Sequence, residues 1–154
     1  YRRVKDEPSE RTRRMLGSVR AFTRFIGEEI SRSVRPGAQS DVLAAPYLYA
    51  VLFAVPGERQ EEFNAWYDQD HVPILLRNRH WREVRRYRIV SGTPERWTHL
   101  TLHYLDDLAA LDSEERRAAR DTQWRRRLAA EPWFRGYYAV YRRRLAAGEQ
   151  AQGA

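Results

Sequence analysis

The sequence predicts an α+β domain whose elements follow the order strand, helix, strand, strand, helix, strand. Three observations support this order. The apolar run YLYAVLFAV at residues 47–55 is closed by Pro56 and is typical of a buried strand. Residues 58–70 then carry apolar side chains at helical spacing. Residues 97–105, WTHLTLHYL, alternate between polar and apolar side chains, which indicates a strand with two different faces.

Two strands and a second helix complete the order. Residues 83–90 alternate, and Ser-Gly-Thr-Pro at residues 91–94 forms the hairpin turn to the next strand. Asp112 or Ser113 is placed to cap a second helix, which ends at the Glu-Pro pair of residues 131–132. The last strand is expected at residues 134–142. This is the split βαβ arrangement called ferredoxin-like.

Such an antiparallel sheet carries both helices on one face and leaves its other face bare. On the strand at residues 97–105, we expect the bare face to hold a polar row and the leucines to meet the helices. The expected bare row is Trp97, His99, Thr101 and His103, and the expected helix-facing row is Leu100, Leu102 and Tyr104. Two such sheets packed face to face form a barrel between subunits, with the bare rows lining a cavity.

An N-terminal helix is expected at residues 10–35, followed by a linker at residues 34–46 that is rich in proline, glycine and serine. Its apolar stripe, with steps of four, three, four and four, is Met15, Val19, Phe22, Ile26 and Ile30. The stripe has to be covered by the domain, a second subunit or another protein. The expected organisation is a helix and linker at residues 1–45, the sheet domain at 46–145 and a flexible tail at 146–154.

Composition excludes several classes of function. The chain has 28 Lys and Arg against 21 Asp and Glu, a net charge of +7, but the arginines are spread along it beside acids, so nucleic acid is not an expected partner. The absence of cysteine excludes disulfides and thiolate chemistry and leaves the cytoplasm as the expected compartment. No apolar run approaches the roughly 20 residues that cross a bilayer, so membrane association is not expected either.

Residues 62–76, EFNAWYDQDHVPILL, contain the first candidate for chemistry. Because Pro73 disfavours helix in the residue before it, we expect the helix to end near Asp70, with His71 just past its last turn. The helix C-terminus and the carboxylates of Asp68 and Asp70 favour imidazolium, whereas burial opposes it. His71 is therefore expected to titrate near neutrality, as a general acid or base, although a plain capping role explains the same pattern.

The same segment, with REVRRYRIVSGTP and WTHLTLHYLDD after it, resembles the EthD-like members of the dimeric α/β-barrel superfamily. The resemblance covers residues 47–144, and its most specific positions are Phe63, Trp66, Tyr67, His71, Pro73, Arg86 and Tyr87. It implies a homodimer that binds a small aromatic or polyketide-like ligand without a cofactor. The superfamily includes cofactor-independent monooxygenases, polyketide cyclases, lactone isomerases, decarboxylases and members without known activity. It makes His71 the first candidate base and His99 the second.

The resulting hypothesis is an enzyme of cyclase, isomerase or decarboxylase type in which His71 removes a proton and Tyr87 and Tyr49 stabilise the enolate. Alternatives are a cofactor-free monooxygenase and a non-catalytic module that binds a ligand or a partner. The expected substrate-binding residues are Tyr49, Trp66, Tyr67, Arg86, Trp97 and His103, although aromatic packing and an Arg86–Glu83 ion pair are competing explanations. No metal is expected, because His99 and His103 lie about 13 Å apart along a strand.

Overall fold

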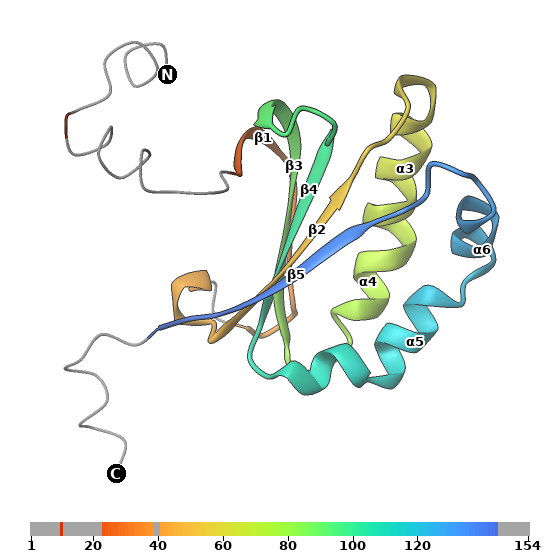
Figure 1. Cartoon of the computed structure of the whole chain (residues 1–154). Helices are drawn as coiled ribbons and strands as arrows, with labels where there is room; N and C mark the ends of the chain where they lie inside the picture. The colour runs from red at the N-terminus through yellow and green to blue at the C-terminus, as the bar shows by residue number, and fades with distance from the viewer. Residues whose placement is uncertain (1–9, 11–22, 39–40, 145–154) are drawn as a thin grey trace.

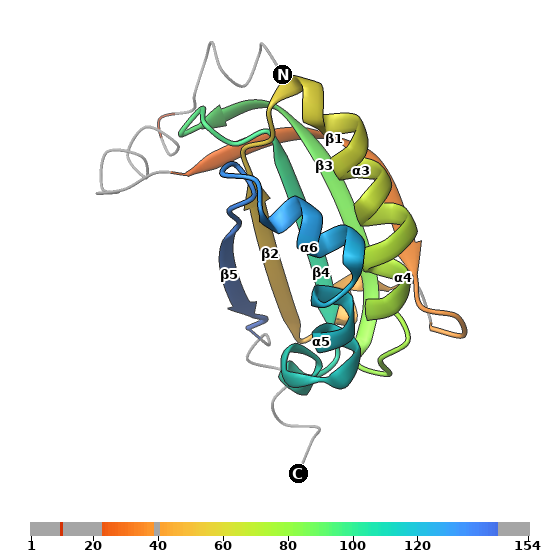
Figure 2. The same ribbon diagram turned by 90° about the vertical axis from the view of Figure 1, so that its right-hand side faces the viewer.

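The computed structural model describes residue 10, residues 23–38 and residues 41–144, and in it four helical segments cover one face of a five-stranded sheet (Figures 1 and 2). The strands are β1 (Arg24–Val34), β2 (Tyr47–Phe53), β3 (Trp81–Thr93), β4 (His99–Leu105) and β5 (Tyr137–Arg142). The helices are α3 (Gln60–Trp66), α4 (Val72–Leu75), α5 (Glu114–Arg120) and α6 (Gln123–Ala129), with a π-turn at Tyr67–His71 and short 3-10 turns at Val42–Ala44, Gly57–Arg59 and Leu108–Asp112. Across these residues, no helix has the length and hydrophobicity that crossing a bilayer requires.

The sheet is antiparallel throughout, with strand order β1-β3-β4-β2-β5. The four strands from β2 to β5, with the helices between them, follow the predicted order along the chain. The α+β prediction is therefore confirmed, and the sheet is compatible with a ferredoxin-like fold. Observed strands are shorter or longer than expected by a few residues at their ends, where sequence patterns are least specific.

The N-terminal helix prediction is wrong over Arg24–Val34, which forms the edge strand β1 and pairs with β3. Ile26, Ile30 and Val34 are four residues apart, a spacing that fits one face of a regular strand as well as one face of a helix, and bulges next to Ile26 and at Ile30 interrupt the alternation in β1. Gly27 allows a close approach at a bulge, because a Cβ there would lie 3.0 Å from the Arg88 carbonyl oxygen. Met15, Val19 and Phe22, and the tail at residues 146–154, lie outside the described residues.

The two faces of β4 are the reverse of the prediction. His99, Thr101, His103 and Leu105 are buried on the face that the helices cover, whereas Leu100, Leu102 and Tyr104 are half-buried on the opposite face. The predicted alternation of β4 is confirmed. The predicted assignment of its two faces is wrong, because the layer between the sheet and the helices contains aromatic and imidazole rings that accommodate polar side chains.

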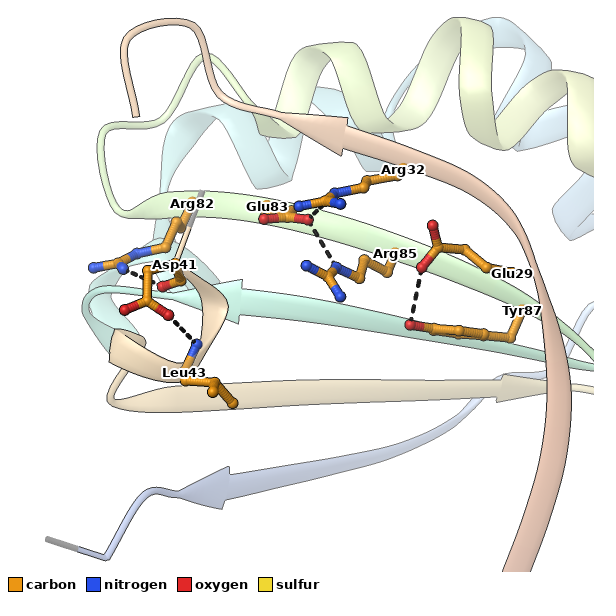
Figure 3. Close-up of polar contacts among 8 residues, drawn as sticks. All are labelled: Glu29, Arg32, Asp41, Leu43, Arg82, Glu83, Arg85 and Tyr87. Atoms are coloured by element: carbon orange, nitrogen blue, oxygen red, sulfur yellow. Dashed lines mark hydrogen bonds and ion pairs between the residues drawn. The ribbon is translucent and has the colours of Figure 1, made fainter. Parts of the chain in front are cut away.

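The sheet face opposite the helices, called the outer face below, combines leucines and tyrosines with a charged group on β1 and β3. Glu83 has no exposed side-chain surface, since Arg32 and Arg85 reach its Oε1 at 2.6 and 2.8 Å (Figure 3). Two arginines thus neutralise and desolvate one carboxylate, which makes burial of its charge tolerable. Glu83 pairs with Arg32 of the neighbouring strand and with Arg85 of its own strand, whereas Arg86 pairs with Asp68.

Candidate functional site

The helix that carries His71 does not end at Asp70, as the proline suggested, but continues to Leu75 through a π-turn. Val72 N–H donates to the Tyr67 carbonyl, five residues back, so the chain is locally wider than an α-helix. Pro73 follows at the start of α4, where its missing N–H costs little. His71 consequently lies inside a continuous helical segment, and a role as a terminal capping group is excluded.

Two carboxylates of the π-turn are anchored to other elements. Asp68 accepts from Ser31 of β1 at 2.8 Å and from Arg86 of β3 at 3.0 Å. Asp70 accepts from the Thr122 hydroxyl at 2.6 Å, and Thr122 in turn caps α6. The two carboxylates are thus engaged in holding the turn in place.

His71 is held in one neutral tautomer. Its Nδ1 lies 3.1 Å from the carbonyl oxygen of Ala119 on α5. Because a carbonyl only accepts, Nδ1 carries the proton and Nε2 keeps the lone pair. Burial, the largest cause, and the positive charges of Arg125, Arg120 and Arg116 together lower the pKa of His71 to about 3, although the bond to the Ala119 carbonyl opposes the shift. The expectation of titration near neutrality is therefore wrong, since burial and arginines outweigh the neighbouring aspartates.

His71 lines a cavity between the helices and the inner face of the sheet. The hollow measures about 430 Å³ including its part open to solvent, but only about 40 Å³ of it admits the centre of a water molecule. The enclosed part therefore has room for a few water molecules, and the rest of the hollow is open to solvent. Its lining comprises Tyr49, Val51, Phe53, Trp66, Tyr67, His71, Leu75, Trp81, His103, Arg116, Arg120, Arg125, Phe134 and Tyr138.

A second neutral histidine lies at the base of the cavity. Trp81 donates its indole N–H to His103 Nδ1 at 3.1 Å, so the proton of His103 is on Nε2. Burial holds the pKa of His103 well below its usual value and raises the pKa of Tyr67 and Tyr49. The inner layer therefore presents uncharged hydrogen-bonding groups, whereas arginines carry the charge of the site.

Five of the predicted site residues come together in this cavity: Tyr49, Trp66, Tyr67, His71 and His103. Tyr87 does not, because it is on the outer face and donates its hydroxyl to Glu29 at 3.3 Å (Figure 3). Trp97 packs against Tyr137 at 6.0 Å, away from the cavity. The face assignment of the strands separates these side chains from His71.

His99 and Arg86 are buried beside the cavity without lining it. His99 packs edge-on against Phe63 at 5.3 Å, and burial lowers its pKa to about 4. Arg86 donates to Asp68 and to the Asn64 side chain, and its guanidinium lies 4.4 Å from the centre of the Tyr67 ring. Its two NH2 groups hold the helix against β3, whereas its buried Nε–H has no hydrogen-bond partner in the described part of the chain.

Sequence reasoning missed the arginines of the cavity and Tyr138. Arg116 and Arg120 are four residues apart and so share a face of α5. Arg125 reaches the same cavity only because the chain breaks at Asp121 and restarts at Thr122, so no single helical period relates it to the others. The predicted second helix is accordingly two helices, with Ser113 capping α5 and Thr122 capping α6.

In the part of the chain that the structure describes, no group of three or more His, Cys, Asp or Glu side chains is placed to hold a metal ion. No family model and no curated protein sequence matches the chain. A solved structure described as "Crystal structure study of anthrone oxidase-like protein" is similar to it, with a TM-score of 0.67 and 15% sequence identity. The match covers 92% of this chain and 64% of that one. At this identity the likeness establishes the fold alone.

Proposed function

We propose that the chain is a cofactor-independent enzyme that uses His71 as a base on an aromatic or polyketide-like substrate. The observation that carries this proposal is the fixed tautomer of His71. Ala119 occupies Nδ1–H and leaves Nε2, with its lone pair, as the nitrogen available to the cavity. The helix is tied to β1, β3 and α6 around this histidine, so the base is held in place before substrate binds.

The proposed step is a proton transfer from a carbon next to a carbonyl or an aromatic ring. The C–H bond breaks, Nε2 of His71 takes the proton, and the electron pair moves to the carbonyl oxygen as an enolate. The hydroxyls of Tyr49 and Tyr138 and the N–H of His103 line the cavity as donors for that oxygen. Return of the proton to another carbon gives isomerisation, attack of the carbanion on a second carbonyl gives cyclisation, and loss of carbon dioxide leads to the same enolate.

Two alternatives keep specific support. The anthrone oxidase-like neighbour favours cofactor-free oxygenation, in which a carbanion formed at an activated methylene reacts with dioxygen and the methylene becomes a ketone with loss of water. A non-catalytic module that assembles subunits or binds a partner is favoured by the small enclosed space of the cavity. Turnover of a panel of anthrones and polyketide-like β-diketones, followed with oxygen uptake, separates the three.

His71→Gln is expected to lower kcat on the substrate found in that panel by about 100-fold or more, as loss of a general base does. His80→Gln is the matched control, because His80 is bonded to Arg79 outside the cavity. In the parent enzyme, kcat/KM should stay flat from pH 8 down to about 5 and fall only as the free enzyme approaches the His71 pKa of about 3. Unchanged turnover in His71→Gln would exclude this role.

We also propose that a second copy of this chain covers the outer face. Tyr137 and Tyr141 are 56% and 58% exposed there, beside the half-buried leucines of β4. The adjacent group of Glu29, Arg32, Glu83 and Arg85 carries both signs of charge, so a two-fold axis matches acids with bases. This arrangement gives the dimeric barrel that the resemblance implied.

Leu102→Arg should convert this dimer to monomers in analytical ultracentrifugation at about 20 µM, because it places a charge at the centre of the outer face. Leu102 lies opposite Arg85 and Ala50 on that face. Val90→Arg, at an exposed position of β3, should leave the dimer intact. A parent protein that is already monomeric at this concentration would contradict the proposal.

A further inference from the structure

Three arginines converge on the cavity from two helices. Arg116 and Arg120 extend from α5 and Arg125 from α6, and all three line the cavity. Arg116 donates one N–H to the Leu111 carbonyl oxygen at 2.9 Å, and its guanidinium lies 6.0 Å from the centre of the Tyr49 ring. Arg125 lies 5.4 Å from the centre of the Phe134 ring. Two of the cations are thus held against the aromatic wall of the cavity.

These cations have no carboxylate partner among the described residues, whereas two other arginines of α6 do. Arg126 pairs with Asp121 and Arg127 with Glu62, whereas Arg116, Arg120 and Arg125 form no ion pair within 4.0 Å. No Asp or Glu lines the cavity. The three arginines that line the cavity therefore have no acid beside them to neutralise their charge, which leaves that charge available to an anion.

The mutual repulsion of the three cations supports this reading. Burial lowers the pKa of Arg125, and the charges of Arg120 and Arg116 lower it further. An anion placed among them relieves that repulsion. Trp66, which also lines the cavity, has a buried indole N–H with no hydrogen-bond partner in the described part of the chain.

We infer that the ligand of this cavity is an aromatic anion, whose ring lies against Trp66 and Phe134 and whose carboxylate or ionised phenol oxygen is bound by Arg116, Arg120 and Arg125. The inference deepens the proposed function by naming the charge of the substrate. The inference rests on the proposed function only in taking this cavity as the substrate site. It does not depend on which reaction takes place there.

Binding of the anion also changes His71. The positive charges of the arginines disfavour the charged form of the His71 imidazole. A bound anion neutralises part of these charges, so the pKa of His71 rises when the ligand is present. His71 is then a stronger base in the complex than in the free protein. The other groups that face it are Tyr67 and Asp70 on its own helix, Tyr49 on β2, His103 on β4 and Tyr138 on β5. Thr122 already binds Asp70, and burial keeps Tyr67, Tyr49 and His103 uncharged, so the arginines dominate the change.

Calorimetry on the full chain with 2-naphthoate and with neutral 2-naphthamide tests the inference. Naphthoate should bind at least about tenfold more tightly, and Arg120→Gln or Arg125→Gln should each remove about tenfold of its affinity while leaving the amide unchanged. Arg117→Gln and Arg127→Gln are matched controls on the same two helices and should change neither ligand by more than about twofold. Circular dichroism checks that each variant is folded. Arg125→Lys is a second variant, which keeps the positive charge but loses the paired N–H donors of the guanidinium.

Equal affinity for the two probes, binding of neither, or an equal loss in the Arg117→Gln control would overturn the inference. A second readout is the titration of the His71 ring nitrogens by NMR. Naphthoate should raise the pKa of His71, and Arg120→Gln should raise it without ligand. The result is independent of the reaction, because His71→Gln is expected to bind naphthoate normally even where turnover is lost. Loss of turnover in His71→Gln supports the enzyme proposal alone, and probe affinity decides the anion inference alone.

Discussion

Phe63→Ala is expected to lower the free energy of unfolding by about 3–5 kcal/mol, the usual cost of removing a buried phenylalanine ring. Phe63 is fully buried at the centre of the aromatic layer between helix and sheet. Six rings surround it at centroid distances of 5.1 to 6.5 Å: Phe53, Trp66, Tyr67, His99, Trp133 and Phe134. The cavity left by its removal cannot close easily, because these rings come from several elements at once.

Urea denaturation measures the effect, and Phe63→Leu is the matched control. Leucine retains most of the volume, so the loss should stay near 1–2 kcal/mol. At about 2–4 °C per kcal/mol for a chain of this size, Phe63→Ala should also lower Tm by roughly 10 °C. A loss below about 1 kcal/mol for Phe63→Ala would mean that the aromatic layer is not a packed core.

Arg86→Met is expected to lower the free energy of unfolding by about 2–4 kcal/mol. The guanidinium is 1% exposed, and it joins β3 to the helix through Asp68 at 3.0 Å and the Asn64 side chain at 2.6 Å. Methionine fills much of the volume but leaves those acceptors without a donor. Because the Asp68 side chain is 37% exposed, water rehydrates it in part when Arg86 is removed. The expected loss of unfolding free energy is therefore smaller than for a fully buried ion pair.

Arg88→Met is the control for this change. Arg88 is on the same strand and pairs with Glu28, but its side chain is 56% exposed, so the loss should stay within about 1 kcal/mol. The Arg86 variant should also move the π-turn, since Asp68 is released from β3 three residues before His71. Equal losses for Arg86→Met and Arg88→Met would show that the buried contacts of Arg86 add nothing to stability.

The candidate site was only partly accessible from the sequence. His71, Trp66 and Tyr67 were found because they share one helical segment, where spacing along the chain predicts a common face. Tyr87 was wrongly placed beside them, because an alternating strand shows which residues share a face without showing which face meets the helices. The charge state of His71 was also misjudged, since the local aspartates are engaged elsewhere and arginines from α5 and α6 surround it instead.

The order of the elements from β2 to β5, an N-cap of α5 at Asp112 or Ser113 and the aromatic content of the first helix could be predicted from the sequence, because these features depend on neighbours a few residues apart. Tertiary structure alone decided that Arg24–Val34 is a strand, since a spacing of four residues fits a helix and a strand equally until β3 supplies the hydrogen bonds. It also decided that His71 is neutral and that three unpaired arginines share its cavity. Burial and long-range charge depend on what the fold brings together, and no local pattern encodes them.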